Sequence, residues 1–285
     1  MIAESRAAAT NGAPTAVTDL ELQLLLEGVQ RLSGHDFREY APAMLRRRVL
    51  ERVRSEGVAT ISGLQERVLH EAGALERFVD ALTFNQSAPF SDPAFFAEFL
   101  THVLPRLRTF PHVRIWIAGC GGADDAYALA ALCKEAKFLE RIRIYATDAS
   151  ESAIERARAG TIVRGDLDEI KLRYARSGGS ARFEDHVEAD GQQLRWAESL
   201  RPHIIVAQHN LATDGSFNEF HLIVLRHSLA KYNRVLVYHA HQVVYESLVR
   251  LGFIALGAKE SLRFTPHQKA YDAVPQTQDF YRRIR

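Results

Sequence analysis

The chain has 285 residues, of which 47% are hydrophobic and 25% charged, a globular composition that excludes a disordered chain, a collagen-like repeat and a disulfide scaffold. Its 36 basic side chains nearly cancel 35 acidic ones, which argues against a protein dedicated to nucleic acid. No apolar run is long enough to span a membrane, and no signal-peptide core follows Met1. We therefore expect a cytoplasmic protein without membrane insertion, with Cys120 and Cys133 as buried thiols.

The N-terminal third predicts a small helical domain over residues 19–88. Residues 1–18 show no periodicity and are expected to form a disordered lead. Asp19 is a candidate N-cap for the first helix, and Gly34 ends it. Apolar spacing near 3.6 residues predicts four helices, starting near Asp19, Ala43, Ser62 and Ala74.

The second of these helices concentrates positive charge. Its arginines are Arg46, Arg47, Arg48, Arg52 and Arg54. Such a face can dock an acidic partner, since complementary charge speeds encounter. The alternative is a solvated face whose arginine stems cover apolar surface. Nucleic acid is disfavoured as the partner, because no aromatic residues alternate with the arginines.

After Pro105, short β-rich runs alternate with helical stretches. Strands are expected at Arg114–Ala118, Arg141–Ala146, Ile204–Ala207, Leu222–Leu225 and Phe253–Leu256. Helices are expected up to Leu132, up to Ala159 and over Val235–Leu248. This alternation predicts an α/β domain with a mostly parallel sheet covered on both faces, over residues 89–275. Residues 164–202 break the rhythm and predict an inserted antiparallel subdomain, and residues 276–285 are expected to form a tail.

Two features of the second domain indicate a ligand site. A strand, a turn with Gly119 and Gly121, and a helix follow one another, which lets a ligand approach the backbone and a helix N-terminus. Asp148 ends the next strand, where an acidic residue can bind both hydroxyls of an adenosine ribose. Asp148 or Ser150 could instead cap the following helix. Together the two features favour a nucleoside-containing cofactor.

At this point the residues resemble the CheR-type methyltransferase family, which methylates chemotaxis receptors. The resemblance covers roughly residues 20–275. Its motifs in chain order are Gly34–Phe37, Tyr40, Met44–Val49, Leu82–Asn85, Phe90–Pro93, Phe96, Arg114–Trp116, Ala118–Cys120, Tyr127, Ala146–Asp148, Ala157–Gly160, Gln208–Leu211, Phe220, Leu222–Ile223, Arg226, Lys259–Leu262 and Tyr271–Val274. No single motif is decisive, and their common order carries the resemblance.

The resemblance implies a Rossmann-like class I methyltransferase domain, doubly wound, with a helical N-terminal domain and an inserted β subdomain. It implies S-adenosylmethionine as cofactor, S-adenosylhomocysteine as product, and methyl transfer to a glutamate of an acidic helical protein in chemotaxis-like signal transduction. The implied cofactor-binding residues are Asn85, Ser87, Gly119, Gly121, Asp125, Asp148, Asn210, Leu211 and His227. The implied catalytic residues are Ser91, Arg226, Lys231 and Tyr232, and the five arginines would bind the partner.

Several positions depart from the family pattern. Ser91 stands where the family has an arginine, Ala123 interrupts the glycine turn, and Asp124 and Asp125 replace two glutamates. Further along, His227 replaces an asparagine and Lys231 the active-site tyrosine, with Tyr232 one position late. These changes support an alternative, a pseudoenzyme that keeps the fold and its partner or ligand but has lost methyl transfer.

Two further features receive ordinary interpretations. His239 and His241 lie two apart, which on a helix gives different faces, and no Cys, Asp or Glu completes a metal-ligand spacing nearby, so no metal is expected. The aromatic stripe is interpreted as core packing between the domains; its members are Phe90, Phe95, Phe96 and Phe99. We expect a monomer.

Overall fold

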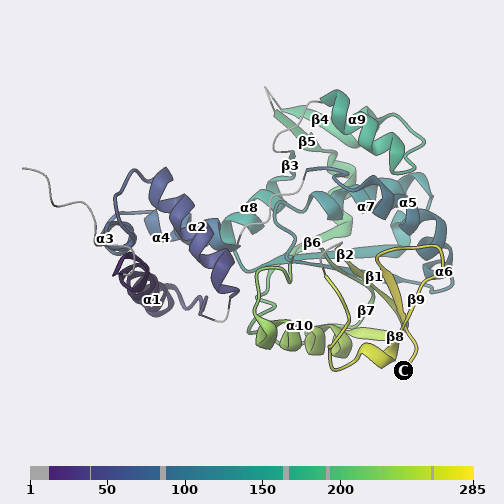
Figure 1. Cartoon of the computed structure of the whole chain (residues 1–285). Helices are drawn as coiled ribbons and strands as arrows, with labels where there is room; N and C mark the ends of the chain where they lie inside the picture. Colours follow the sequence, from purple (N-terminus) through teal and green to yellow (C-terminus); the bar gives the residue numbers. More distant parts are fainter. Residues whose placement is uncertain are drawn as a thin grey trace, which may run out of the picture. The chain divides into compact units, whose positions relative to one another are not determined.

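The computed structural model describes residues 13–38, 40–83, 88–162, 167–190, 193–226, 228–257 and 260–285. The chain divides into two compact units, residues 1–82 and 83–285. Each is described by itself (Figure 1). Among the described residues, no helix combines the length and the apolar character that crossing a membrane requires.

The first unit is helical. Its helices are α1 (Ala13–Ser33), α2 (Pro42–Ser55), α3 (Ile61–His70) and α4 (Ala74–Thr83), the last ending at the boundary. Thr60 caps α3 by accepting the backbone N–H of Gly63. The core is made by one face of each helix, with Leu25 and Val29 of α1 fully buried.

The predicted start of the first helix at Asp19 is wrong. Helix α1 already runs from Ala13, so Asp19 lies inside it and forms an ion pair with Arg46 of α2 instead of capping. Pro14 falls in the first turn, where a missing N–H costs nothing. The part of the predicted disordered lead at residues 1–12 lies outside the described residues.

The second unit is built on a seven-stranded sheet of order β6-β2-β1-β7-β8-β10-β9. Its strands are β1 (Val113–Ala118), β2 (Ile142–Asp148), β6 (Ile204–Gln208), β7 (Phe220–Leu225), β8 (Leu248–Leu256), β9 (Tyr271–Ala273) and β10 (Phe280–Arg283). The first five pair in parallel, and β10 is antiparallel to β8 and β9. The predicted mostly parallel sheet is therefore confirmed.

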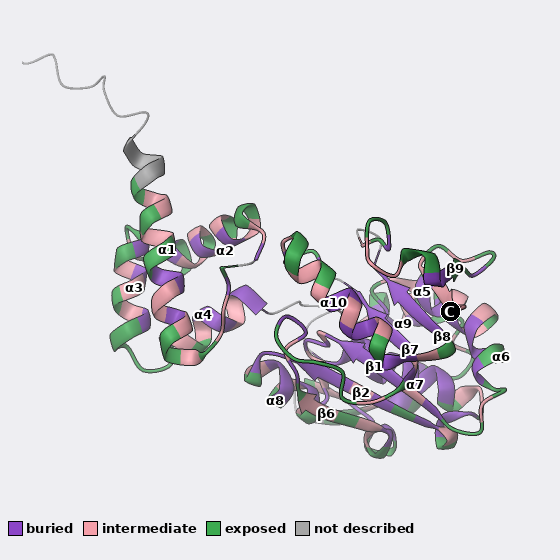
Figure 2. Cartoon of the chain, turned by 90° about the horizontal axis from the view of Figure 1, so that it is seen from below, coloured by how far each residue is buried: buried purple, intermediate pink, exposed green. Residues whose placement is uncertain are grey.

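Helices cover both faces of this sheet. They are α5 (Pro93–Glu98), which continues through a π-helical turn (Phe99–Val103) into α6 (Leu104–Leu107), then α7 (Asp124–Glu135), α8 (Glu151–Ala159) and α10 (Arg234–Ser247). Figure 1 shows α7 on one face and α10 on the other. The central strands β1, β2, β7 and β8 are mostly buried (Figure 2), which explains their continuous apolar runs.

A smaller antiparallel sheet of order β3-β5-β4 confirms the predicted extra subdomain. Its strands are β3 (Thr161–Ile162), β4 (Val187–Asp190) and β5 (Gln193–Trp196). The subdomain also contains α9 (Leu167–Arg176), which the sequence did not predict. Ile170 and Tyr174 are its only buried residues, a two-residue pattern too short to recognise.

The predicted C-terminal tail is wrong, because β10 lies inside the sheet. Phe280 is buried and stacks on Phe95 at 5.0 Å between ring centroids. The aromatic stripe does form core, as expected, but it packs within the second unit, where Phe90 contacts Tyr174 and Trp196. The two cysteines are free and buried, as predicted.

Candidate functional site

The site begins where the strand order reverses. Strand β1 lies between β2 and β7. The strands that follow β1 directly in the chain, β2 and then β6, extend the sheet on one side of it, and the later strands, from β7 on, extend it on the other side. In doubly wound sheets, ligands bind at the carboxyl edge beside this switch point. The segments that reach this edge follow β1, β2, β6 and β7, and they hold most of the described residues that the sequence predicted for the site.

The turn after β1 requires glycine. Gly119 has a φ of +73°, and a side-chain carbon there would lie 2.4 Å from Oγ of Ser228. Its N–H donates to the carbonyl of Thr147 at 2.8 Å. Gly121, also left-handed, donates its N–H to Oδ2 of Asp148 at 3.0 Å. The predicted glycine turn and the predicted acidic residue are therefore in direct contact.

Asp148 bridges two loops. It is buried, and its Oδ1 accepts the N–H of Ser150 at 3.0 Å. The hydroxyl of Ser150 caps α8 by accepting the N–H of Ala153. Of the two residues that the sequence offered as the cap of this helix, Ser150 and not Asp148 is therefore the N-cap. Because a carboxylate can accept about four hydrogen bonds, Asp148 keeps acceptor capacity for a ligand hydroxyl.

Arg226, at the end of β7, is held between two carboxylates. Its Nη2 lies 2.9 Å from Oδ2 of Asp92, and its Nη1 lies 3.3 Å from Oδ2 of Asp125. The guanidinium also lies 4.2 Å from the ring centroid of Phe95. The arginine side chain is only 3% exposed, so this is a buried charge that depends on its partners.

The first turn of α7 carries two aspartates in different environments. Burial raises the pKa of Asp124 to about 8, and the indole N–H of Trp196, which donates at 3.4 Å, opposes this shift. Oδ1 of Asp125 is buried and has no hydrogen-bond partner among the described residues. Tyr127 stacks on Trp196 at 5.7 Å between ring centroids, and both rings are buried in the core below this turn of the helix.

The other predicted site residues fall in three groups. Lys231 and Tyr232 are buried on the segment after β7, with the ammonium 5.6 Å from the tyrosine ring. Asn210 uses its side-chain oxygen to accept the N–H of Ala212 in the loop after β6, beside the buried Leu211. The third group lies outside the described residues and comprises Asn85, Ser87 and His227.

Ser91 is exposed, and no hydrogen bond of its side chain occurs among the described residues. The contact with Arg226 comes from its neighbour Asp92, which the predicted site residues did not include; they did not include Trp196 either. The Asp92-Pro93 pair could have revealed a helix start, because Asp92 caps α5 and Pro93 is its first residue. No local signal marks the indole of Trp196.

The arginines of α2 do not form one free face. Arg46 pairs with Asp19, Arg52 with Glu56, and Arg48 donates to the carbonyls of Ala81 and Leu82. Arg47 and Arg54 remain exposed, and Arg47 lies 3.8 Å from Glu51.

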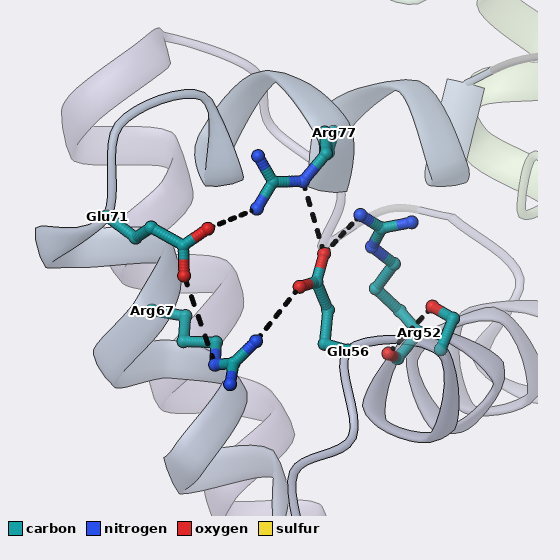
Figure 3. Close-up of polar contacts among 6 residues, drawn as sticks. Arg52, Glu56, Arg67, Glu71 and Arg77 are labelled. Atoms are coloured by element: carbon teal, nitrogen blue, oxygen red, sulfur yellow. Dashed lines mark hydrogen bonds and ion pairs between the residues drawn. The ribbon is translucent and has the colours of Figure 1, made fainter.

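Glu56 is the centre of a network in the first unit (Figure 3). Arg52, Arg67 and Arg77 all contact its carboxylate, the last two at 3.3 and 3.2 Å, and Arg77 also reaches Glu71 at 2.6 Å. The network ties the end of α2 to α3 and α4. Part of the predicted partner surface therefore stabilises its own unit.

The Glu56→Gln variant should melt about 3 °C lower than the wild type at neutral pH, because three arginines lose their shared carboxylate. The hydrogen bond from Arg77 lowers the pKa of Glu56, so its contribution is complete above the ordinary glutamate range and is lost as the pH falls. Thermal melts from neutral to acid pH measure both effects. Glu51→Gln, an exposed neighbour, is the control. Equal melts for Glu56→Gln and wild type at neutral pH would show that the network adds no stability.

The fold and the loops at the switch point define a class: a doubly wound α/β domain with carboxylates placed for a nucleoside-containing ligand. Two family models specify it further. "CheR methyltransferase, SAM binding domain" matches residues 85–280, and "CheR methyltransferase, all-alpha domain" matches residues 20–83. The chain belongs to the CheR methyltransferase family. The Rossmann-like methyltransferase fold and S-adenosylmethionine as cofactor are thereby confirmed.

Two relatives found by sequence agree with this assignment. Methyltransferase Cher3 of Pseudomonas putida is 35% identical, over 93% of this chain and 97% of its own. The chemotaxis protein methyltransferase of Listeria innocua is 25% identical, over 86% and 92% of the two chains. Among solved structures, the N-methyltransferase NodS from Bradyrhizobium japonicum aligns over 68% of this chain and 99% of its own, at 14% identity and a TM-score of 0.38.

The site residues fit this cofactor. S-adenosylmethionine combines an ammonium, a sulfonium and a ribose. The unpartnered buried Oδ1 of Asp125 suits a cationic hydrogen-bond donor, and the remaining acceptor capacity of Asp148 suits the ribose hydroxyls. Metal ligation has no comparable basis: among the residues that the structure describes, no group of three His, Cys, Asp or Glu side chains converges.

Proposed function

We propose that the protein transfers the methyl group of S-adenosylmethionine to a glutamate carboxylate of a protein, in chemotaxis-like signalling in the cytoplasm. The names of the Listeria relative and of a Pseudomonas aeruginosa relative, chemotaxis protein methyltransferase 1 (27% identical over 74% of this chain and 79% of its own), support methyl transfer in chemotaxis, and the glutamate acceptor rests on the family resemblance. The observation that carries the proposal is the buried Oδ1 of Asp125, which has no hydrogen-bond partner among the described residues and lies at the sheet edge that we propose for the cofactor.

The reaction asks little of the protein. When bound, the cofactor supplies an electrophilic methyl on a sulfonium, and the C–S bond breaks as a carboxylate oxygen forms the new C–O bond. A glutamate is ionised at neutral pH and needs no general base. The residues therefore bind, orient and exclude water. Asp125 and Asp148 would hold the two ends of the cofactor.

We propose a reduced version of the predicted partner surface. Arg47 and Arg54 are seven residues apart, two turns of α2, so they project from the same side of the helix. Both are exposed, unlike the arginines bound within the unit. An acidic helix of the acceptor protein would meet these two charges.

The test is methyl transfer from cofactor labelled at the methyl group to a bacterial membrane and cytosol extract. A glutamate methyl ester releases its label as volatile methanol in base, whereas a methylated amine does not. We expect base-labile label that requires the protein. Cofactor binding without any transfer, measured by calorimetry on the same preparation, would contradict the proposal.

Asp148→Asn should weaken S-adenosylmethionine binding about 10- to 100-fold, because a hydrogen bond to a charged group is lost at the ribose. Asparagine still accepts one of the two backbone N–H groups, so the fold should persist. Isothermal titration measures the affinity, and circular dichroism checks the fold. Asp272→Asn, an exposed aspartate on β9, is the matched control. An unchanged affinity would remove Asp148 from the cofactor site.

A second candidate, a binding module without methyl transfer, is favoured by one observation. The predicted catalytic Ser91 is exposed, and Arg226 is already neutralised by Asp92 and Asp125. An acceptor carboxylate then finds no unpaired guanidinium within the described part of this site. Binding of S-adenosylmethionine without labelled product in any extract would identify this function.

A further inference from the structure

The second unit has a groove between α10 and the loop after β8. Its volume is about 390 Å³, within the range of ligand sites. The lining residues are Arg234, Val237, Tyr238, Arg263, Phe264 and Thr265. None of them belongs to the predicted cofactor or catalytic sets. The groove is therefore a surface that the transfer site does not explain.

The charge of the groove has one sign. Arg234 and Arg263 are exposed, and no described carboxylate lies within ion-pair distance of either. Arg234 is also the first residue of α10, where the helix dipole disfavours a cation. Its positive charge therefore destabilises the helix, and no described carboxylate forms an ion pair with it. Both guanidinium groups are available to an anionic partner.

The main apolar side chain of the groove, Phe264, is exposed to solvent by a backbone conformation that is energetically unfavourable. Phe264 is 84% exposed and adopts a φ of +63°, a region that bulky residues avoid. The turn is fixed because the N–H of Phe264 donates to Oε1 of Gln268, and the hydroxyl of Thr265 donates to the carbonyl of Leu262. Tyr238, 54% exposed, lies across the groove. Exposed aromatic residues beside arginine are typical of protein-binding hot spots.

The groove lies at the same edge of the sheet as the transfer site. Arg234 follows the segment after β7 that carries Arg226 and Lys231, and Arg263 follows β8. Glu260 links the two segments, since its carboxylate accepts the N–H of Leu229 and of Gly257, each at 2.8 Å. A partner held in the groove would therefore lie beside the loops of the site.

We propose that this groove docks an acidic segment of a partner protein that carries aliphatic side chains. Glutamates of the segment pair with Arg234 and Arg263, and its aliphatic side chains pack on Phe264 and Tyr238. The hollow shape favours a protruding segment over a flat bilayer. The exposure of the two rings favours it over a small ligand, which would be mostly enclosed. This docking is independent of methyl transfer.

The experiment measures fluorescence polarisation of the full chain with three short labelled peptides. One is composed of glutamate and leucine, one has lysine for glutamate, and one has serine for leucine. We expect saturable binding of the first alone, weakened by salt. Two further arms use ATP, and vesicles of phosphatidylcholine with and without phosphatidylglycerol.

Two variants locate the binding. Phe264→Gly removes the ring and relieves the positive φ, so it keeps the fold while weakening the peptide about tenfold. Leu251→Gly is its matched control, because Leu251 is also exposed with a φ of +66°. Arg234→Gln with Arg263→Gln should weaken binding by at least about tenfold, while Arg250→Gln, an exposed arginine on β8, leaves it unchanged.

Equal binding of the three peptides, or no binding, would overturn the proposal, as would insensitivity to Phe264→Gly. Binding of ATP that depends on Phe264 and exceeds peptide binding would reassign the groove to a nucleotide. Flotation with phosphatidylglycerol vesicles that Phe264→Gly abolishes, without peptide binding, would reassign it to a membrane surface.

Discussion

Replacing Arg226 with methionine is expected to lower the free energy of unfolding of the second unit by about 3 kcal/mol. The substitution leaves Asp125 buried without its cation and removes the contact with the ring of Phe95. The effect stays at the low end of the range for buried pairs, because Asp92 is 37% exposed and water can replace its partner. Urea denaturation followed by circular dichroism measures this change.

The double variant Arg226→Met with Asp125→Asn separates charge from packing. If the uncompensated carboxylate causes the loss, neutralising Asp125 should recover about half of it. Arg250→Met, which removes an exposed arginine from the same unit, should change stability by less than about 0.5 kcal/mol. A similarly small change for Arg226→Met would show that the buried guanidinium contributes nothing net.

The central strands could be predicted because burial on both faces leaves a continuous apolar run. Strand β1 (Val113–Ala118) has five of six residues buried, and its sequence reads as such a run. The two ends of helix α8 are likewise marked in the sequence: Ser150 is its N-cap, and Gly160, in the left-handed conformation, ends it. Wherever one local rule dominates, the element follows from the sequence.

The missed elements are those that depend on tertiary partners. Strand β10 (Phe280–Arg283) has one buried residue, and only its pairing with β8 and β9 makes it a strand. Helix α1 starts six residues earlier than Asp19 suggests, since that aspartate pairs with Arg46, 27 positions away, instead of capping. Neither partner can be inferred from the local pattern.

The same distinction applies to the site. Gly121 and Asp148 could be expected together because both follow adjacent parallel strands, and they are joined by a 3.0 Å hydrogen bond. The cluster around Arg226 could not, because Asp92 is 134 positions away and Asp125 is 101. Which carboxylate reaches a given cation depends on side-chain directions that no spacing rule supplies.

Asp124→Asn is expected to remove a pH dependence from the stability of the second unit. Burial raises the pKa of Asp124 to about 8, while the unfolded chain has the ordinary aspartate value near 4. Between these values the folded state holds an extra proton, so the free energy of unfolding falls by up to about 1.4 kcal/mol per pH unit as the pH rises. Above about pH 8 this decline ends.

Asparagine preserves the shape and still accepts the indole N–H of Trp196 through its side-chain oxygen, so only the titration is lost. The variant should therefore be more stable than the wild type at pH 8 and should approach it near pH 4, in urea denaturation across this range. For Asp272→Asn, at an exposed site, the plot of unfolding free energy against pH should run parallel to that of the wild type. Parallel curves for Asp124→Asn and the wild type would show that Asp124 is ionised in the folded protein. The proposed site would then hold one more negative charge beside Asp125, which would strengthen its preference for a cationic cofactor.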